Sequence, residues 1–289
     1  MTDTTAETFD TGRPAAVIGG GRMGTGIAHA LVLAGAAVTL IEVDAAAMNA
    51  AEQTVRALIG ESARRGTLAG DAGQANKRLR VASSVDEIAG AALVIEAVPE
   101  LPGLKAEVLG AIEHRVAETA LIATNTSSIS VVQLASGLRH PHRFLGMHFF
   151  NPVPASKLVE IVVGDATGGP AVTQARRWVD AMAKTAIVVK DSPGFASSRL
   201  GLALGLEAIR MVEQGVASPE DIDSAMVLGY RHPLGPLRLT DLVGLDVRLD
   251  IAEYLSSQLG ARFEPPQLMR DMVYRGELGK KSGQGFYSW

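Results

Sequence analysis

A glycine-rich stretch that directly follows an apolar run constrains this chain more than any other feature. The sequence AAVIGGGRMGTGIA, residues 15–28, carries Gly19, Gly21 and Gly24 in the spacing G-x-G-x-x-G. The first glycine permits a tight turn out of a strand, the second lets a phosphate approach the main chain, and the third lets a helix pack closely on a sheet. Because helix N-termini attract anions, the stretch predicts a strand, a turn and a helix that bind the pyrophosphate of a dinucleotide.

An acidic residue at the end of the next apolar run indicates which dinucleotide binds. Glu42 ends the run AAVTLIE and follows Gly21 by 21 residues. A carboxylate at this place accepts hydrogen bonds from ribose hydroxyls and repels a 2′-phosphate, and no arginine follows it closely. We therefore expect NAD rather than NADP, with Arg22 and Met23 of the glycine turn also beside the cofactor.

The composition excludes several other classes of protein. The 289 residues include 27 basic and 31 acidic side chains, and the formal net charge of −4 argues against a general affinity for nucleic acid. There is no cysteine, so thiolate metal sites and cysteine nucleophiles are impossible, and we predict no metal site. Residues 1–14 are polar, as in a frayed tail rather than a targeting peptide. No apolar run reaches the ~20 residues that span a bilayer, so we expect a cytoplasmic protein without a membrane partner.

Short apolar runs in the first half predict a parallel sheet. They are continuously apolar rather than alternating, as expected of strands that helices cover on both faces. A helix-like stretch separates the first two runs, and another, from residue 45 to about 68, follows the second. This alternation predicts an α/β fold with a Rossmann-type, doubly wound domain. The predicted strands are 15–19, 36–42, 92–98, 120–125 and 143–150.

The sequence changes character near residue 190. The stretch 199–215 is apolar on most faces and predicts a buried helix. The following SPED resembles a capping box, with Ser218 as the N-cap and a proline at the first helical position. We therefore expect an NAD-binding domain over 13–190, followed by a mainly helical domain over 191–289.

The stretch 124–162 contains polar side chains suited to proton transfer. A serine hydroxyl such as Ser127 can position a substrate oxygen, an imidazole such as His148 can move its proton, and a carboxylate such as Glu160 can hold the imidazole. The same trio occurs in hydrolases, although Ser127 lacks the G-x-S-x-G turn that exposes a nucleophile. From the residues alone, a purely structural role for His148 stays open, as we assume for His29, His114, His140, His142 and His232.

Several long motifs make the chain resemble the 3-hydroxyacyl-CoA dehydrogenase family, in particular its short single-function type, which includes 3-hydroxybutyryl-CoA dehydrogenases. The resemblance covers about residues 14 to 287. The motifs that carry it are VIGGGRMGTGIA, NTSSIS, GMHFFNPVPASKLVEIV, DSPGF, HPLGPLRLTDLVGLD and GKKSGQGFYSW.

The resemblance implies a reaction and a role for each matching residue. The reaction is reversible hydride transfer from C3 of an (S)-3-hydroxyacyl-CoA to NAD, which yields the 3-ketoacyl-CoA. His148 is the implied base, Glu160 orients it, and Ser127 binds the substrate oxygen. The residues implied beside the nicotinamide half of NAD or beside the substrate are Glu100, Lys105, Asn125, Ser127 and Asn151.

One position departs from the family pattern. The family usually has an asparagine after SPGFxx, whereas this chain has Ser198 there. A serine offers a single hydroxyl in place of an amide pair. Water or Ser197 could replace the lost contact, or the substrate preference could differ, so we keep Ser198 among the predicted catalytic residues.

The resemblance also implies partners. Arg64 and Arg65 lie where the family holds the CoA nucleotide, so we predict that they contact its phosphates, although a solvated surface pair is equally compatible with this sequence. The helical domain is expected to bind substrate and to form a homodimer.

Two alternative functions stay open. One is a dehydrogenase of a small free hydroxy acid, carnitine- or gulonate-like, or of an acyl-carrier thioester. The other is an NAD(H)-binding protein with little catalysis.

Overall fold

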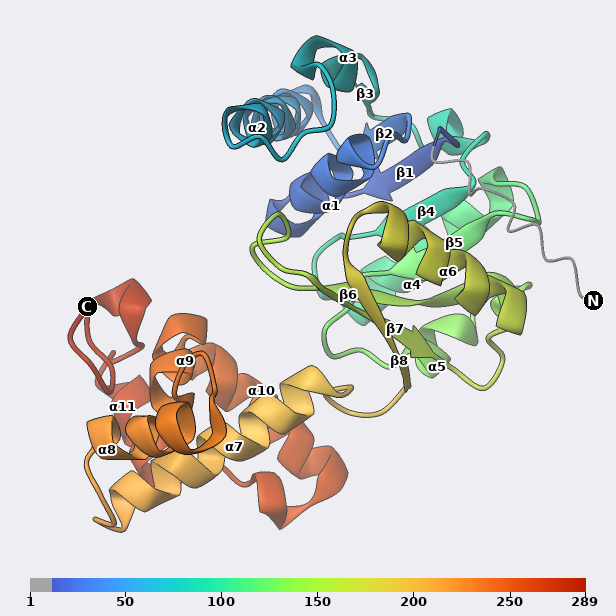
Figure 1. The fold of residues 1–289 in the computed structure, drawn as a ribbon. Coiled ribbons are helices and arrows are strands. Elements are labelled where there is room, and N and C mark those ends of the chain that lie inside the picture. The colour runs from blue at the N-terminus through green and yellow to red at the C-terminus, as the bar shows by residue number, and fades with distance from the viewer. Residues whose placement is uncertain (1–11) are drawn as a thin grey trace, which may run out of the picture. The chain divides into compact units, whose positions relative to one another are not determined.

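The computed structural model describes residues 12–289, which form two compact units that divide after Asp191 (Figure 1). Most of the expected frayed tail, residues 1–11, lies outside the described part of the chain. The first unit is built on a sheet and the second consists mainly of helices. The predicted fold class, a Rossmann-type domain followed by a mainly helical one, is therefore confirmed.

The first unit contains an eight-stranded sheet with the order β3-β2-β1-β4-β5-β6-β7-β8. Every ladder is parallel except that between β6 and β7. The five predicted strands are present, and the sheet gains β3, β7 and β8, which the apolar runs did not predict. The strands are β1 (Ala15–Ile18), β2 (Val38–Ile41), β3 (Leu79–Ala82), β4 (Leu93–Glu96), β5 (Leu121–Thr124), β6 (Phe144–Phe149), β7 (Leu158–Val163) and β8 (Thr185–Lys190).

Helices cover this sheet and bury its apolar side chains. One buried apolar cluster joins the sheet to α1 and α6. It includes Val17 of β1, Ile95 of β4 and Ala123 of β5. Leu109 and Ile112 of α4 are fully buried outside that cluster, since α4 packs against β4 and β5. The helices are α1 (Arg22–Leu33), α2 (Ala45–Arg64), α3 (Ala72–Lys77), α4 (Pro102–Arg115), α5 (Val131–Ala135) and α6 (Gly169–Ala181), with short turns η1 (Val85–Ile88) and η2 (Pro141–Arg143).

The second unit packs its helices around a separate apolar core that includes Leu202, Leu206 and Leu237. The predicted cap is confirmed, because the Ser218 hydroxyl accepts a hydrogen bond from the Asp221 N–H at 3.2 Å. The helices are α7 (Ser197–Glu213), α8 (Pro219–Ser224), α9 (Pro236–Val243), α10 (Leu245–Leu259) and α11 (Gln267–Tyr274), with short turns η3 (Ala225–Gly229), η4 (Ala261–Phe263) and η5 (Lys280–Ser282). Within 12–289, no helix combines the length and apolar character needed to cross a membrane.

Candidate active site

Several of the predicted site residues of the first unit follow or end strands at one edge of the sheet. The glycine turn follows β1, Glu100 follows β4, the NTSS segment follows β5, and His148 lies next to last in β6. Parallel strands place their carboxyl ends at a common edge, and ligands of doubly wound sheets bind there, where the strand order reverses. In this sheet the reversal lies between β1 and β4.

The glycine turn has the geometry that close backbone packing requires. Gly19 has a φ of +99°, which favours glycine, and a Cβ on Gly24 would collide with the Gly19 carbonyl oxygen. Gly21 differs, because no atom lies within 4 Å of where its Cβ would be. Two of the glycines therefore serve the turn itself, and the third leaves open space in front of the backbone.

This open space suits the phosphates of a dinucleotide. Gly21 is the N-cap of α1, and no side chain caps this helix end. Uncapped N–H groups and the helix dipole favour an anion at such a place. A surface hollow extends from here, lined by Gly20, Gly21, Arg22, Thr25, Gly26, Thr54, Leu58 and residues 151–154. The backbone and the donors present fit the pyrophosphate of NAD.

Glu42 stands beside the glycine turn as the ribose-binding prediction requires. Its Oε1 accepts a hydrogen bond from the Gly20 N–H at 2.5 Å, and its Oε2 accepts one from the Val43 N–H at 3.0 Å. These bonds hold the carboxylate at the end of β2, and each oxygen retains a lone pair for a ribose hydroxyl.

His148 and Glu160 form a buried pair. They lie directly opposite each other in the antiparallel ladder of β6 and β7, and His148 Nδ1 lies 2.7 Å from Glu160 Oε2. His148 is 6% exposed and Glu160 is fully buried. A carboxylate only accepts, so Nδ1 carries the hydrogen and the basic lone pair of the imidazole lies on Nε2. The Phe150 ring packs on the imidazole, with 4.5 Å between the ring centroids.

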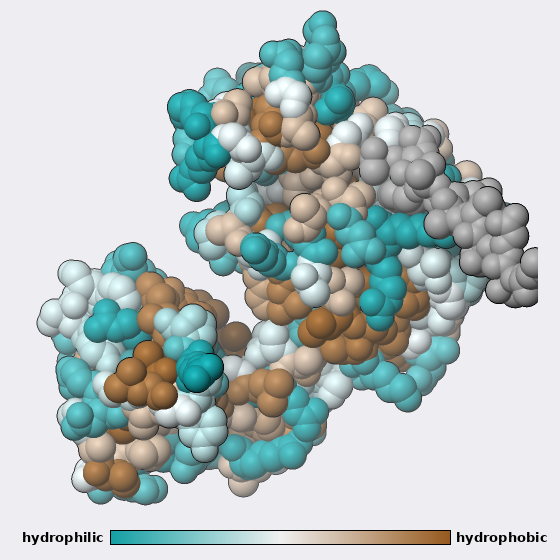
Figure 2. All heavy atoms as spheres, in the orientation of Figure 1, coloured by the Kyte–Doolittle hydropathy of each residue, from teal (hydrophilic) through white to brown (hydrophobic). Residues whose placement is uncertain are grey.

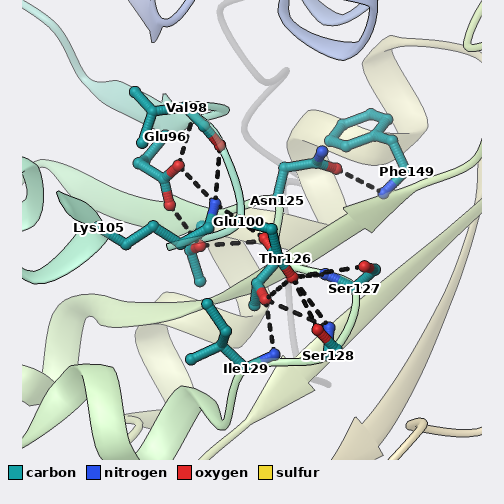
Figure 3. Close-up of polar contacts among 11 residues, drawn as sticks. Glu96, Val98, Glu100, Lys105, Asn125, Thr126, Ser127, Ser128, Ile129 and Phe149 are labelled. Carbon is teal, nitrogen blue, oxygen red and sulfur yellow. Dashed lines mark hydrogen bonds and ion pairs between the residues drawn. The ribbon is translucent and has the colours of Figure 1, made fainter. Parts of the chain in front are cut away.

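Glu100 is the centre of a dense polar network (Figure 3). Its Oε1 accepts hydrogen bonds from the Thr126 hydroxyl at 2.6 Å and from the N–H groups of Ser127 at 2.9 Å and Ser128 at 3.1 Å. Partial burial opposes ionisation, but the Thr126 bond and the charge of Lys105 hold the pKa of Glu100 below its ordinary value. Glu100 therefore orders the segment that carries Ser127, whose side chain is exposed.

Lys105 is a buried cation that pairs with Glu100. The ammonium is 1% exposed and lies 2.7 Å from Glu96 Oε1, 3.2 Å from the Val98 carbonyl oxygen and 3.2 Å from Glu100 Oε2 (Figure 3). An ammonium has three donors, and these partners use all of them. The structure thus gives Lys105 an inward, positioning role, and a direct contact with NAD remains a prediction.

Two charged residues that our sequence reasoning overlooked also hold parts of this region in place. Glu96 is fully buried and also accepts from the Thr124 hydroxyl at 2.6 Å. Lys184 donates to the carbonyl oxygens of Val153 and Ser156 and so holds the loop between β6 and β7. The sequence signal that could have revealed Glu96 is a charged residue at the end of an otherwise apolar run, LVIE.

The remaining predicted residues lie in varied environments. Asn125 accepts a hydrogen bond from the Phe149 N–H at 2.9 Å and thereby links the ends of β5 and β6. Asn151 is exposed beside the hollow of the glycine turn. Arg64 and Arg65 are both exposed and paired with Glu61, so their contact with CoA remains a prediction. Ser198 belongs to the other unit, in the first turn of α7, and is half-buried.

Comparisons with known proteins agree with this architecture. The family description "3-hydroxyacyl-CoA dehydrogenase, NAD binding domain" matches residues 14–192, and "3-hydroxyacyl-CoA dehydrogenase, C-terminal domain" matches residues 194–289. The crystal structure of (S)-3-hydroxybutyryl-CoA dehydrogenase PaaH1 from Ralstonia eutropha superposes with a TM-score of 0.91 at 38% identity, over 96% of this chain and 99% of that one.

Curated relatives carry related names. A probable 3-hydroxybutyryl-CoA dehydrogenase of Bacillus subtilis is 38% identical over 94% of this chain and 96% of its own length. The 3-hydroxyadipyl-CoA dehydrogenase of Escherichia coli is 37% identical over 95% of this chain, which spans 58% of that longer protein. With both of its units matched, the chain belongs to the 3-hydroxyacyl-CoA dehydrogenase family.

Proposed function

We propose that this member of the NAD-dependent 3-hydroxyacyl-CoA dehydrogenases oxidises (S)-3-hydroxyacyl-CoA to 3-ketoacyl-CoA with His148 as the general base. The observation that carries the proposal is the buried His148–Glu160 pair, at the same sheet edge as the glycine turn. The Nδ1 hydrogen bond to Glu160 leaves Nε2 as the proton acceptor. Bound NAD supplies the hydride acceptor, and the chain supplies orientation and proton transfer.

Each site residue then has a defined task. In oxidation, Nε2 of His148 takes the proton of the C3 hydroxyl, and the Glu160 carboxylate stabilises the imidazolium that forms. The hydroxyls of Ser127 and Ser198 bind the substrate oxygen. In reduction, the imidazolium returns the proton to the developing alkoxide. Glu100 and Lys105 hold the Ser127 segment, so they act through position.

Activity assays test this proposal directly. With acetoacetyl-CoA as substrate, we expect the absorbance of NADH to decay. With the keto forms of free acids such as carnitine and gulonate, we expect no decay. Turnover of a free acid together with inertness toward the CoA ester would reject the proposal. The alternatives of a free-acid dehydrogenase or a non-catalytic NAD(H)-binding protein are not favoured, because both units match the acyl-CoA family.

We also propose that the protein is a homodimer through its helical unit. Leu239, Leu242 and Val243 lie on one face of α9 and are 38%, 44% and 41% exposed, and Val247 of α10 is 41% exposed. Apolar patches are visible on the surface of the helical unit in Figure 2. Light scattering is expected to give twice the chain mass. Leu242→Lys is expected to give monomers, whereas Leu228→Lys, at an exposed residue of η3, is expected to keep the dimer.

A cytoplasmic location of this protein remains a prediction from the sequence.

A further inference from the structure

Arg248 is a buried cation to which the structure assigns no anion. The residue lies in α10 and is 7% exposed. Its Nε is completely buried without a hydrogen-bond partner, and within 12–289 the guanidinium forms no salt bridge. Burial lowers its pKa to about 10. A buried charge without a counter-charge is costly, so this site favours an anionic ligand.

Of the acidic side chains near Arg248 in the chain, Asp246 and Asp241 are engaged by other groups, and Asp250 is exposed and forms no salt bridge with Arg248. Asp246, two residues before Arg248, pairs with Lys281. Asp241 in α9 accepts hydrogen bonds from the N–H groups of Phe286 and Tyr287 and from the Trp289 indole. These carboxylates hold the last residues of the chain in place. Within 12–289 no carboxylate forms a salt bridge with Arg248, so an anion that pairs with it would be a ligand.

The Arg248 guanidinium lies against the face of α7 that carries Ser198. A Cβ built on Gly201 would lie 3.6 Å from its Nη1, and one built on Gly205 would lie 3.8 Å from the same atom. Ser198, Gly201 and Gly205 have the spacing i, i+3 and i+7, which places them on one helix face. At 1.5 Å per residue, the guanidinium lies about 5 to 10 Å along this face from Ser198.

We propose that Arg248 binds the terminal carboxylate of a 3-hydroxyacyl-CoA whose acyl chain carries a second carboxyl group. This inference rests on the proposed function, in which Ser198 contacts the oxygen at C3. A carboxylate that lies several carbon–carbon bonds of about 1.5 Å beyond C3 spans this distance. The guanidinium offers a carboxylate two parallel hydrogen bonds. A neutral acyl chain leaves the cation unpaired, so the arrangement selects for the dicarboxylic substrate.

A pair of thioesters of equal length tests the proposal on the unaltered enzyme. With NADH present, kcat/KM is measured for 3-oxoadipyl-CoA and for its terminal methyl ester, which lacks the second charge. We expect kcat/KM for the free acid to exceed that for the ester by about 10-fold or more, the range of a hydrogen bond to a charged group. Equal values would overturn the inference and leave the proposed function intact. Inertness of both thioesters and of acetoacetyl-CoA would instead remove the proposed function.

A variant then assigns the selectivity to Arg248. Arg248→Met, which keeps the length of the side chain without its charge, is expected to bring the free acid-to-ester ratio close to one. The control Arg275→Met alters an exposed arginine of the same unit that pairs with Glu277, and it should keep the ratio. If Arg248→Met fails to fold, the comparison on the unaltered enzyme still decides. A folded Arg248→Met variant that keeps the ratio, whether dimeric or monomeric, would overturn the proposal.

Discussion

His148 and Glu160 meet because of a single feature of strand register. In the antiparallel ladder, facing residues have Cβ atoms about 5 Å apart, so an imidazole and a carboxylate on one face reach each other directly. Both side chains are buried, where a hydrogen bond to an ion is stronger than in water. At the residue scale, the pair therefore provides an imidazole of defined tautomer, which we expect to act as the base.

Replacement of the base tests this chemistry. His148→Ala is expected to lower kcat by at least ~10²-fold, the usual contribution of general acid–base catalysis. Binding of NADH, followed by its fluorescence, should stay near that of the unaltered protein. His142→Ala serves as the control, because His142 is an exposed histidine before β6. An unchanged kcat in His148→Ala would remove this residue from the mechanism.

We expect one side chain, that of Glu42, to decide the preference for NAD over NADP. Glu42→Ala removes the carboxylate that repels a 2′-phosphate, so the preference for NAD over NADP, as a ratio of kcat/KM values, is expected to fall by about 10-fold or more. Glu52→Ala is the matched control, since Glu52 is a partly exposed glutamate of α2 that pairs with Arg56. A ratio that Glu42→Ala leaves unaltered would contradict this assignment.

At the scale of elements, the buried ions join the ends of β4 and β5 to α4. Glu96 ends β4, Thr124 ends β5, and Lys105 rises from α4 between them. Because Glu100 and the Ser127 segment rest on this network, we expect it to affect catalysis through the position of Ser127. Replacing one member of a buried ion pair by a neutral residue leaves the other charge uncompensated, whereas replacing both members does not.

A double-mutant cycle separates these effects. Glu96→Gln is expected to destabilise the protein by about 3–5 kcal/mol, and Lys105→Met by a similar amount. The double variant should be more stable than the sum of the two losses predicts, measured by urea unfolding. Glu96→Gln should also raise KM for NAD more than it lowers kcat. Strict additivity of the two losses would show that the ions do not interact.

At the scale of the whole molecule, two units with separate cores share one chain, and we expect a buried histidine to make the first unit sensitive to acid. His29 of α1 is 2% exposed and hydrogen-bonded to the Ser62 hydroxyl of α2 at 2.9 Å. Burial, helped by the charge of Lys184 and opposed by the Leu58 backbone, lowers the pKa of His29 from 6.5 to about 4. The unfolded chain therefore binds a proton that the folded unit does not bind until the pH is near 4.

This difference predicts a loss of stability in acid. The contribution of neutral His29 is complete above pH 6.5 and falls as the pH drops from 6.5 to 4, by up to about 3 kcal/mol. Trp178, fully buried in the first unit, reports its unfolding in urea when Trp289 is replaced by Phe. His29→Gln in this background should flatten the dependence between pH 7 and pH 4.5. An equal slope in both proteins would place the acid sensitivity elsewhere.

Local sequence alone determined the parts of this protein that depend on neighbours in the chain. The glycine spacing predicted the β1 turn, continuous apolar runs predicted the buried parallel strands, and Ser218 predicted its cap, since each property acts over a few residues. Strand β3 was missed because the exposed Arg80 interrupts its apolar run, and β7 because Glu160 interrupts its own. Strand β8 contains the apolar run AIVV, which our sequence analysis did not use.

Only the tertiary structure decided which distant side chains meet. Glu160 lies opposite His148 because of the β6–β7 register, Lys105 turns inward because Glu96 and Glu100 surround it, and Arg248 lies over the glycines of α7 because α10 packs there. These contacts join residues far apart in the chain. Their energies come from burial and charge pairing, which no local pattern of residues encodes.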